Sequence, residues 1–386
     1  MTLDSESPLA RLALAAPTIL YRSGVAARNW LFDAGMLRRA RLPVPVISVG
    51  NITVGGTGKT PLVSEIVRHF SGRALRAAVL TRGYGRQRRG RGAGPIVLRS
   101  GPGPGVSGGA VLLDPATADS RVTGDEPLML ARQNPGVPIV IGTDRRETGR
   151  LAVEQLGAQA VLLDDGFQHR WLARDLDIVV LDSYDPFGHF RLLPSGRLRE
   201  PLSSLGRADV LVVTRAPTGD PLQTLQDVVR RHNAGAPCFR ASQRPVSLVP
   251  ISGGAEIATS SLAGKPVAAF CGIGNPESFR SGLLALDAPV VRFDAFRDHF
   301  SYTIGDVTRL LALARRAGAA CLVTTEKDAT RIDGAALAPA PPGRALPILV
   351  LRIRCEIEEG EAFFKLLDRV ALAGHEGVQR SGRERS

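Results

Sequence analysis

A glycine-rich loop between an apolar strand and a helix constrains the fold of this chain more than any other feature. The segment TVGGTGKT (53–60) follows the continuous apolar run VPVISVGN (44–51), which indicates a buried parallel strand. Residues 62–70 carry apolar side chains at helical spacing, and Pro61 suits a first helical turn. This order is typical of a phosphate-binding P-loop, although Thr53 stands where the usual pattern has glycine. A plain glycine-rich turn is the alternative.

Further apolar runs repeat the strand signature with helical or loop segments between them: 77–83, 137–142, 160–165, 177–182 and 209–215. This alternation predicts an α/β fold with a doubly wound parallel sheet. A second series of strands and helices begins near residue 216 and predicts a second, smaller α/β domain. We therefore expect four regions: a basic helical segment (1–41), a P-loop core (42–215), the second domain (216–371) and a disordered tail (372–386). Within the core, 83–109 is an arginine- and glycine-rich segment, expected to be a mobile loop, with a candidate strand at 95–99.

Charge and composition narrow the classes of partner. Lys and Arg total 49 against 37 for Asp and Glu, a net charge of +12 that suits a nucleic acid, a nucleotide or an anionic membrane. Aromatic residues are only 5%, and no helix-turn-helix, zinc or RNA-binding pattern occurs, which argues against nucleic acid. The four cysteines lie far apart, so a zinc site or disulfide framework is not expected. No apolar run approaches the ~18 residues of a membrane span, so we expect a soluble or membrane-peripheral protein.

The segment 8–41 has the composition of amphipathic helices that lie on membranes. It combines six arginines with one acid, Asp33, and with apolar and aromatic positions such as Trp30 and Phe32. Basic helices with aromatic residues bind anionic bilayers. Helices that simply pack on the sheet are the alternative.

Several polar residues stand where a P-loop protein carries its chemistry. Lys59 would reach the β- and γ-phosphate oxygens, and the Thr60 hydroxyl would ligate Mg²⁺. The apolar run 160–165 ends in Asp164 and Asp165, and carboxylates at the end of a strand in the same sheet hold Mg²⁺ and its waters in such proteins. A strand-ending turn with a helix cap is the alternative for these two acids.

Three further segments are, on their own, more typical of structure than of chemistry. GDEP (124–127) places two acids at a helix start, where carboxylates suit the helix dipole. LLPSGRLREP (192–201) resembles a solvated loop, and FRDHF (296–300) contains a histidine that suits a partly buried structural role.

Taken together, these motifs resemble those of the tetraacyldisaccharide 4'-kinase family of the lipid A pathway. The resemblance spans residues 8–370, and the threonine at position 53 is itself how the loop of that family looks. The motifs occur in the family's order and at about its spacing: VGNITVGGTGKTP (49–61), TRGYGR (81–86), GDEP (124–127), DDGFQHR (164–170), RLLPSGRLREP (191–201), FRDHFSYT (296–303) and TEKDATR (325–331).

The resemblance implies two Rossmann-like domains joined by a short β hinge, and a kinase that uses ATP and Mg²⁺. It implies transfer of the γ-phosphoryl group to the 4'-hydroxyl of tetraacyldisaccharide 1-phosphate, which gives lipid IVA. By resemblance, Asp125 and His299 form the catalytic dyad and act with Lys59, although this chain has Phe300 where the family often has a second histidine. The implied metal residues are Thr60, Asp164, Asp165 and Glu200, and the implied nucleotide-binding residues are Thr53, Val54, Gly55, Gly56, Thr57, Gly58, Lys59 and Thr60.

The resemblance also predicts partners and location. We expect the lipid A precursor as substrate and the anionic surface of the inner membrane as a peripheral docking site on its cytoplasmic face, with no nucleic acid and no obligate protein partner. A P-loop GTPase or metallochaperone is one rival class. Its guanine-reading N-K-x-D pattern is not matched by TEKD (325–328), which lacks the asparagine. A basic nucleic-acid-binding protein is the other rival.

Overall fold

A computed structural model of the chain describes residues 8–84, 86, 94–216, 222–332 and 346–383. Its helices are α1 (Pro8–Asp33), α2 (Lys59–Gly72), α3 (Ser120–Thr123), α4 (Asp125–Gln133), α5 (Arg145–Glu154), α6 (Gln223–His232), α7 (Pro276–Leu284), α8 (Ile304–Arg316), α9 (Glu326–Ala329) and α10 (Gly360–Arg383), with short 3-10 turns at Gly188–Phe190, Leu202–Arg207 and Thr259–Leu262. Its strands are β1 (Val46–Gly50), β2 (Ala77–Thr81), β3 (Ile96–Leu98), β4 (Val111–Leu113), β5 (Ile139–Ile141), β6 (Ala160–Asp164), β7 (Leu176–Asp182), β8 (Val210–Thr214), β9 (Cys238–Pro250), β10 (Ile257–Ala258), β11 (Val267–Cys271), β12 (Val290–Ala295), β13 (Cys321–Thr325) and β14 (Ile348–Ile357).

One sheet runs through the molecule in the order β12-β11-β13-β14-β9-β8-β7-β1-β6-β2-β5-β3-β4, with β10 paired to β9. Around β1 the strands are parallel, because β1 pairs with β6 on one side and β7 on the other, and β2, β5 and β8 continue this direction. The predicted doubly wound parallel sheet is therefore confirmed. The loop after β1 lies at the carboxyl edge of the sheet, where ligands bind in folds of this class.

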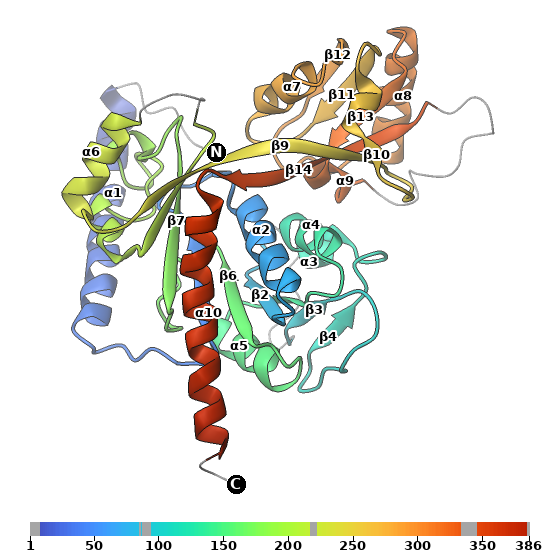
Figure 1. Cartoon of the computed structure of the whole chain (residues 1–386). Helices are drawn as coiled ribbons and strands as arrows, with labels where there is room; N and C mark the ends of the chain where they lie inside the picture. The colour runs from blue at the N-terminus through green and yellow to red at the C-terminus, as the bar shows by residue number, and fades with distance from the viewer. Residues whose placement is uncertain (1–7, 85, 87–93, 217–221, 333–345, 384–386) are drawn as a thin grey trace.

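A long antiparallel ribbon of β9 and β14 connects the two halves of the molecule (Figure 1). β9 has 13 residues; it begins beside β8 and then pairs with β14 along most of its length. β14 continues the parallel group of β11, β12 and β13 in the second half. The β hinge that the resemblance implies stays a prediction, and this ribbon is the candidate for it.

Helices cover both faces of the first half. Ile178 and Val180 of β7 enter the core that contains α2, α4 and α10, whereas Val179 and Leu181 face the core that contains α6. Since alternate strand residues point to opposite faces, these helices lie on opposite sides of the sheet. Full burial of each such side chain stabilises the fold by about 1.5–3 kcal/mol.

The packing divides the chain differently from the boundaries expected at residues 216 and 371. Val229 of α6 packs in a core of the first half, and Phe363 and Leu367 of α10 join the core around α2. The two cores of the second half are built from residues between 248 and 351. The chain thus leaves the first half along β9 and returns along β14. Sequence periodicity does not reveal this return, because it shows that a helix has a buried face but not which sheet covers it.

The ends of the chain also differ from the prediction. The segment 8–41 contains the one helix α1, with Pro17 inside it, followed by an irregular stretch. α10 continues to Arg383 instead of ending where the tail (372–386) was predicted; no proline interrupts it after residue 372, although three glycines there are poor helix formers. Residues 87–93 of the expected basic loop lie outside the described residues. No helix in the described part of the chain is long and apolar enough to cross a membrane.

Candidate active site at the junction of the two halves

The glycine loop follows β1 and begins α2, as predicted. Gly55 and Gly58 have φ angles of 115° and 81°, values that glycine adopts without steric cost. A Cβ atom at Gly58 would approach Nε2 of Gln243 to 2.9 Å. At Gly56 no described atom lies within 4 Å of a Cβ position. The backbone of the loop is therefore shaped by glycine and open to a ligand.

Side chains hold the loop through its carbonyl oxygens, with Arg197 donating to Val54 at 2.9 Å, Arg215 to Gly56 at 2.8 Å and Thr214 to Thr57 at 2.8 Å. The first N–H groups of α2 have no partner within the helix and point out of its N-terminus. The hydroxyl oxygen of Thr57 is buried without a hydrogen-bond partner in the described structure. An orphaned buried hydroxyl at a helix N-terminus is the environment that a phosphate oxygen completes. The loop therefore fits a polyphosphate.

Lys59 lies where its charge would meet phosphate oxygens. Its Nζ atom is 3.0 Å from Oδ1 of Asn51 and 3.5 Å from Oδ1 of Asp165, and its side chain is 12% exposed. Thr60, the second residue of α2, is half-buried beside it. Asn51 was not among the predicted site residues, although it follows β1 directly.

The two acids after β6 have different environments. Asp164 is buried and accepts a hydrogen bond from Oγ1 of Thr81 at 3.1 Å. Burial, together with the negative charges of Glu126 and Asp165, raises the pKa of Asp164 to about 7. Burial would also raise the pKa of Asp165, but Lys59 and Arg199 outweigh it and lower this pKa to about 2. Adjacent carboxylates of this kind attract a cation.

The predicted dyad comes together where the halves meet. Asp125 begins α4 in the first half, and His299 follows β12 in the second; Nδ1 of His299 lies 3.1 Å from Oδ2 of Asp125. Arg331, just after α9, binds the same carboxylate through Nε at 2.8 Å and through Nη2. Burial would raise the pKa of Asp125, but the hydrogen bond from His299 and the charges of Arg331 and Lys327 hold it well below its usual range.

Polar contacts continue along the line between α4 and α9. Oε1 of Glu126 is 3.5 Å from Nζ of Lys327, and Gln133 donates to Oε2 of Glu326 at 2.9 Å. The backbone N–H of Ile353 in β14 also donates to Glu326. Burial nevertheless raises the pKa of Glu326 to about 7. The two halves are therefore in direct contact beside Asp125.

Glu200, predicted to lie near the metal, has its carboxylate occupied by other side chains. It is fully buried, and its oxygens bind Arg28 at 3.2 Å, Asn29 at 3.1 Å and Arg207 at 2.8 Å. Two of these partners belong to α1, so Glu200 fastens α1 to the first half. A glutamate beside an arginine in a loop gives no sign in the sequence of a buried partner some 170 residues earlier.

A group of buried basic side chains lies close to Asp164 and Asp165. Arg145 is 3% exposed, and its Nε atom has no hydrogen-bond partner in the described structure. Burial lowers its pKa to about 10, so it stays charged at neutral pH. The nearby Nε2 atom of His169 is also buried without a partner, and burial with the charge of Arg145 lowers the pKa of His169 to about 4. His169 is therefore uncharged at neutral pH, whereas the unpartnered buried donor of Arg145 carries a positive charge and suits an anion.

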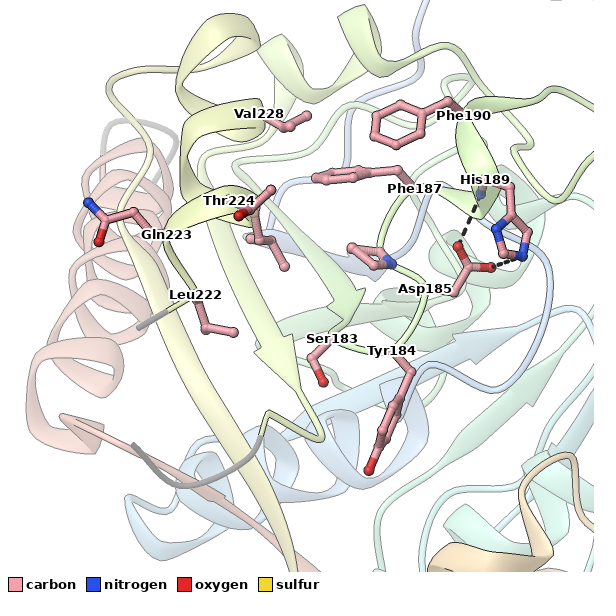
Figure 2. A pocket seen from close by; sticks show the side chains of 12 residues that line it. Ser183, Tyr184, Asp185, Phe187, His189, Phe190, Leu222, Gln223, Thr224 and Val228 are labelled. Carbon is pink, nitrogen blue, oxygen red and sulfur yellow. Dashed lines mark hydrogen bonds and ion pairs between the residues drawn. The ribbon is translucent and has the colours of Figure 1, made fainter. Parts of the chain in front are cut away.

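A cavity of about 650 Å³, which no sequence motif predicted, adjoins the loop on the side of β7 and β8 (Figure 2). Its wall is mainly aromatic and aliphatic, with Tyr184, Phe187, Phe190, Leu222, Leu225 and Val228. Asp185 and Tyr184 connect it to the loop, because Arg197 binds Asp185 at 3.0 Å and Arg215 stacks on Tyr184 at 5.9 Å.

Comparison with known proteins identifies the family. The profile of the tetraacyldisaccharide-1-P 4'-kinase family matches residues 10–371. The chain belongs to the tetraacyldisaccharide 4'-kinase family. The tetraacyldisaccharide 4'-kinase of Syntrophus aciditrophicus is 40% identical over 373 residues, which cover 94% of this chain and 93% of that protein. That of Anaeromyxobacter dehalogenans strain 2CP-C is 41% identical over 363 residues, with 92% and 90% covered.

A solved structure agrees with this assignment. LpxK from Aquifex aeolicus, crystallised in complex with ATP, is similar with a TM-score of 0.68 and 31% identity, and the match covers 93% of this chain and 99% of that one. This tetraacyldisaccharide 4'-kinase family member is therefore an ATP-dependent enzyme of lipid A biosynthesis, as the motif series predicted. The predicted enzyme class and the use of ATP are confirmed, whereas the roles of single residues remain predictions.

Proposed function

We propose that this kinase transfers the γ-phosphoryl group of ATP to the 4'-hydroxyl of tetraacyldisaccharide 1-phosphate at the junction of its halves. The observation that carries the assignment of roles is the 3.1 Å contact between His299 and Asp125 beside a loop that fits a polyphosphate. Neither half contains both residues, so the reaction requires the halves to be together.

In this proposal Asp125 accepts the proton of the sugar hydroxyl. The hydroxyl oxygen bonds to the γ-phosphorus, the bond from that phosphorus to the β,γ-bridging oxygen breaks, and ADP leaves. The hydroxyl proton passes to the Asp125 carboxylate. His299 orients that carboxylate and, with a side chain 40% exposed, passes the proton to solvent.

The phosphates are held by Lys59 and the N–H groups at the start of α2. The hydroxyl of Thr60 and the carboxylates of Asp164 and Asp165 would hold Mg²⁺, since these are the oxygen donors it prefers. When bound, Mg²⁺ neutralises charge on the phosphates. The described residues contain no cluster of three or more His, Cys, Asp or Glu side chains for a metal, which agrees with a cation completed by phosphate and water. Glu200 is left out of this set because its oxygens already bind Arg28, Asn29 and Arg207.

Arg145 and His169 form a candidate binding site for the anionic substrate. Arg145 has an unpartnered Nε atom and lies near Asp164 and Asp165, and the unpartnered Nε2 atom of His169 lies near Arg145. We assign this group to the phosphate that the disaccharide already carries. A charge-assisted hydrogen bond to a phosphate would satisfy the orphaned donor of Arg145.

We further propose that α1 lies against the anionic cytoplasmic surface of the inner membrane. One side of α1 is held against the first half: Glu200 binds two of its residues, the Tyr21 hydroxyl donates to a backbone oxygen at 2.8 Å, and Phe32 is buried against Trp171 with ring centroids 5.0 Å apart. Its apolar side chains Ile19, Leu20 and Trp30 remain 65%, 76% and 62% exposed. A helix that exposes apolar groups beside arginines binds anionic bilayers.

The catalytic roles are tested with labelled ATP, Mg²⁺ and the disaccharide 1-phosphate in detergent micelles. Asp125→Asn and His299→Ala should each lower kcat by about 10²–10⁴-fold, and the double variant should be hardly worse than the poorer single one, because the two residues act as one unit. ATP affinity should not change. The exposed pair Asp227→Asn and His232→Ala on α6 is the matched control. Fully additive losses would contradict the dyad.

The membrane role is tested by sedimentation with vesicles of anionic phospholipid. Arg22→Glu with Arg38→Glu, both exposed, should reduce vesicle binding while ATP binding persists. Reversal of two exposed arginines of the second half, Arg280 and Arg309, is the control for net charge. Arg22 lies in α1 and Arg38 in the stretch that follows it. Equal vesicle binding by this double variant and the wild type would refute the proposal.

A further inference from the structure

All contacts that the described residues make with the Asp125 carboxylate fall on one oxygen. Arg331 donates to Oδ2 through Nε at 2.8 Å and through Nη2, and Nδ1 of His299 lies 3.1 Å from the same atom. Oδ1 has no protein partner in the described part of the chain. The carboxylate is thus held through one oxygen, and the other is left for a ligand.

Arg331 is itself fixed by a second set of contacts. Its Nη1 atom donates to the carbonyl oxygen of Gly272 at 2.7 Å and lies 3.4 Å from Oδ1 of Asp328. Asp328 is completely buried and accepts hydrogen bonds from the Gly272 N–H at 2.9 Å and the Tyr302 hydroxyl at 3.0 Å. With only 7% of Arg331 exposed, its planar guanidinium is held between the two carboxylates.

We propose that Arg331 is a positioning residue for phosphoryl transfer, which holds Asp125 through Oδ2 so that Oδ1 faces the acceptor hydroxyl. The proposal rests on the role of Asp125 as proton acceptor. Arg331 does not touch the reacting atoms and acts through the carboxylate. The planar fork of an arginine sets the orientation of a carboxylate, whereas a lysine ammonium supplies only a point charge.

Through the contact between Arg331 and Asp125, charges of the second half also affect the protonation of a carboxylate in the first half. Among the described residues, the charged and titratable groups around Asp125 include Glu126 of α4, Tyr84, whose ring lies 6.5 Å from that of His299, and, from the second half, Asp298, His299, Lys327, Asp328 and Arg331. Asp298 lies 4.0 Å from Nη2 of Arg331 and 3.8 Å from Nε2 of His299, and it offsets part of their charge. Loss of the Arg331 charge therefore raises the pH at which Asp125 takes up a proton. Activity that needs the ionised carboxylate is then lost at a higher pH.

The test compares kcat against pH for the wild-type enzyme, Arg331→Gln, Arg331→Lys and the exposed control Arg280→Gln. In Arg331→Gln we expect kcat to fall at least about tenfold at neutral pH. The acidic limb of the profile, where kcat falls as the pH is lowered, should shift to a pH higher by about 1–3 units, the usual effect of an arginine on the pKa of a nearby aspartate. In Arg331→Lys the limb should stay near its wild-type position, because the charge remains, while kcat stays low, because the fork is lost. The KM for ATP should change less than twofold in all variants, which corresponds to a difference in binding free energy of less than about 0.4 kcal/mol.

The outcomes separate this proposal from the role of Asp125. An acidic limb that does not move in Arg331→Gln, in an enzyme that Asp125→Asn still inactivates, would overturn the positioning role alone. Near wild-type activity of Asp125→Asn would overturn both. If Arg331→Gln does not fold, as judged by circular dichroism, Arg331→Lys decides the question: wild-type kcat in that variant would overturn the proposal.

Discussion

Replacing Glu200 by alanine should loosen α1 and lower thermal stability without changing the response to Mg²⁺. In the structure Glu200 is fully buried and receives hydrogen bonds from Arg28, Asn29 and Arg207. The side chain of Arg207 is only 20% exposed, so the substitution leaves a poorly solvated cation without its partner. The substitution therefore tests whether Glu200 has a structural role or lies near the metal, as the resemblance implies.

The size of the effect follows from that burial. Removal of one partner of a buried ion pair costs about 3–5 kcal/mol, because the remaining charge stays out of water. At roughly 2.1 cal/mol/K of unfolding entropy per residue, a chain of 386 residues that unfolds as one unit would lose about 4–6 °C in Tm, and more if the first half unfolds separately. The control Glu256→Ala removes an exposed partner of Arg352 and should cost at most about 1 kcal/mol.

Thermal unfolding followed by circular dichroism measures the first effect, and kcat as a function of Mg²⁺ at fixed ATP measures the second. We expect a clear loss of Tm in Glu200→Ala, little change in Glu256→Ala and the same Mg²⁺ dependence in both. A Glu200→Ala protein with the Tm of the wild type and a Mg²⁺ requirement raised tenfold or more would refute this reasoning and return Glu200 to the metal site.

Three further outcomes are expected. Lys59→Ala should lower kcat by about 10²–10³-fold, the usual cost of one preorganised donor in a transition state, and turnover within about threefold of wild type would remove Lys59 from the site. Phe363→Ala should cost about 3–5 kcal/mol in urea unfolding, because its ring is buried in the core around α2; a loss below about 1 kcal/mol would mean that α10 does not complete that core. Burial raises the pKa of Glu326 to about 7, above its unfolded value near 4.5, so its contribution to stability is present below pH 4.5 and is lost as the pH rises to about 7. Glu326→Gln should therefore flatten the fall in unfolding free energy between pH 5 and about 8, and an unchanged pH dependence would refute the assignment.

The sequence predicted the strands of the parallel sheet well for a physical reason. Strands buried on both faces, such as β1 and β6, are continuous apolar runs, and each ends at the polar residues of the site. β4 was missed because it has three residues that are not fully buried. The full length of β9 is hidden in the sequence, because Pro245 interrupts the strand signal although the strand continues to Pro250.

The sequence was less informative about long-range partners. Asp125 and His299 were paired through the family resemblance and not through any spacing, since 174 positions separate them. Arg331 lies inside the motif 325–331, yet only the folded chain shows which carboxylate it binds. The metal role of Glu200 came from the resemblance and stays a prediction, but only the folded chain shows that Arg28 and Asn29 of α1 bind its carboxylate.

Because the chain returns to the first half along β14, the two halves complete their folding in a different order from their synthesis on the ribosome. Ribosomes release the N-terminal end first, and domains generally fold as they emerge. The second half draws its cores from residues between 248 and 351, all of which leave the ribosome before α10. The nucleotide-binding half begins earlier but lacks Phe363, Leu367 and Ala371 until translation is almost complete. The half that is synthesised first is therefore the half that finishes folding last, and it exposes an apolar face until the final helix arrives.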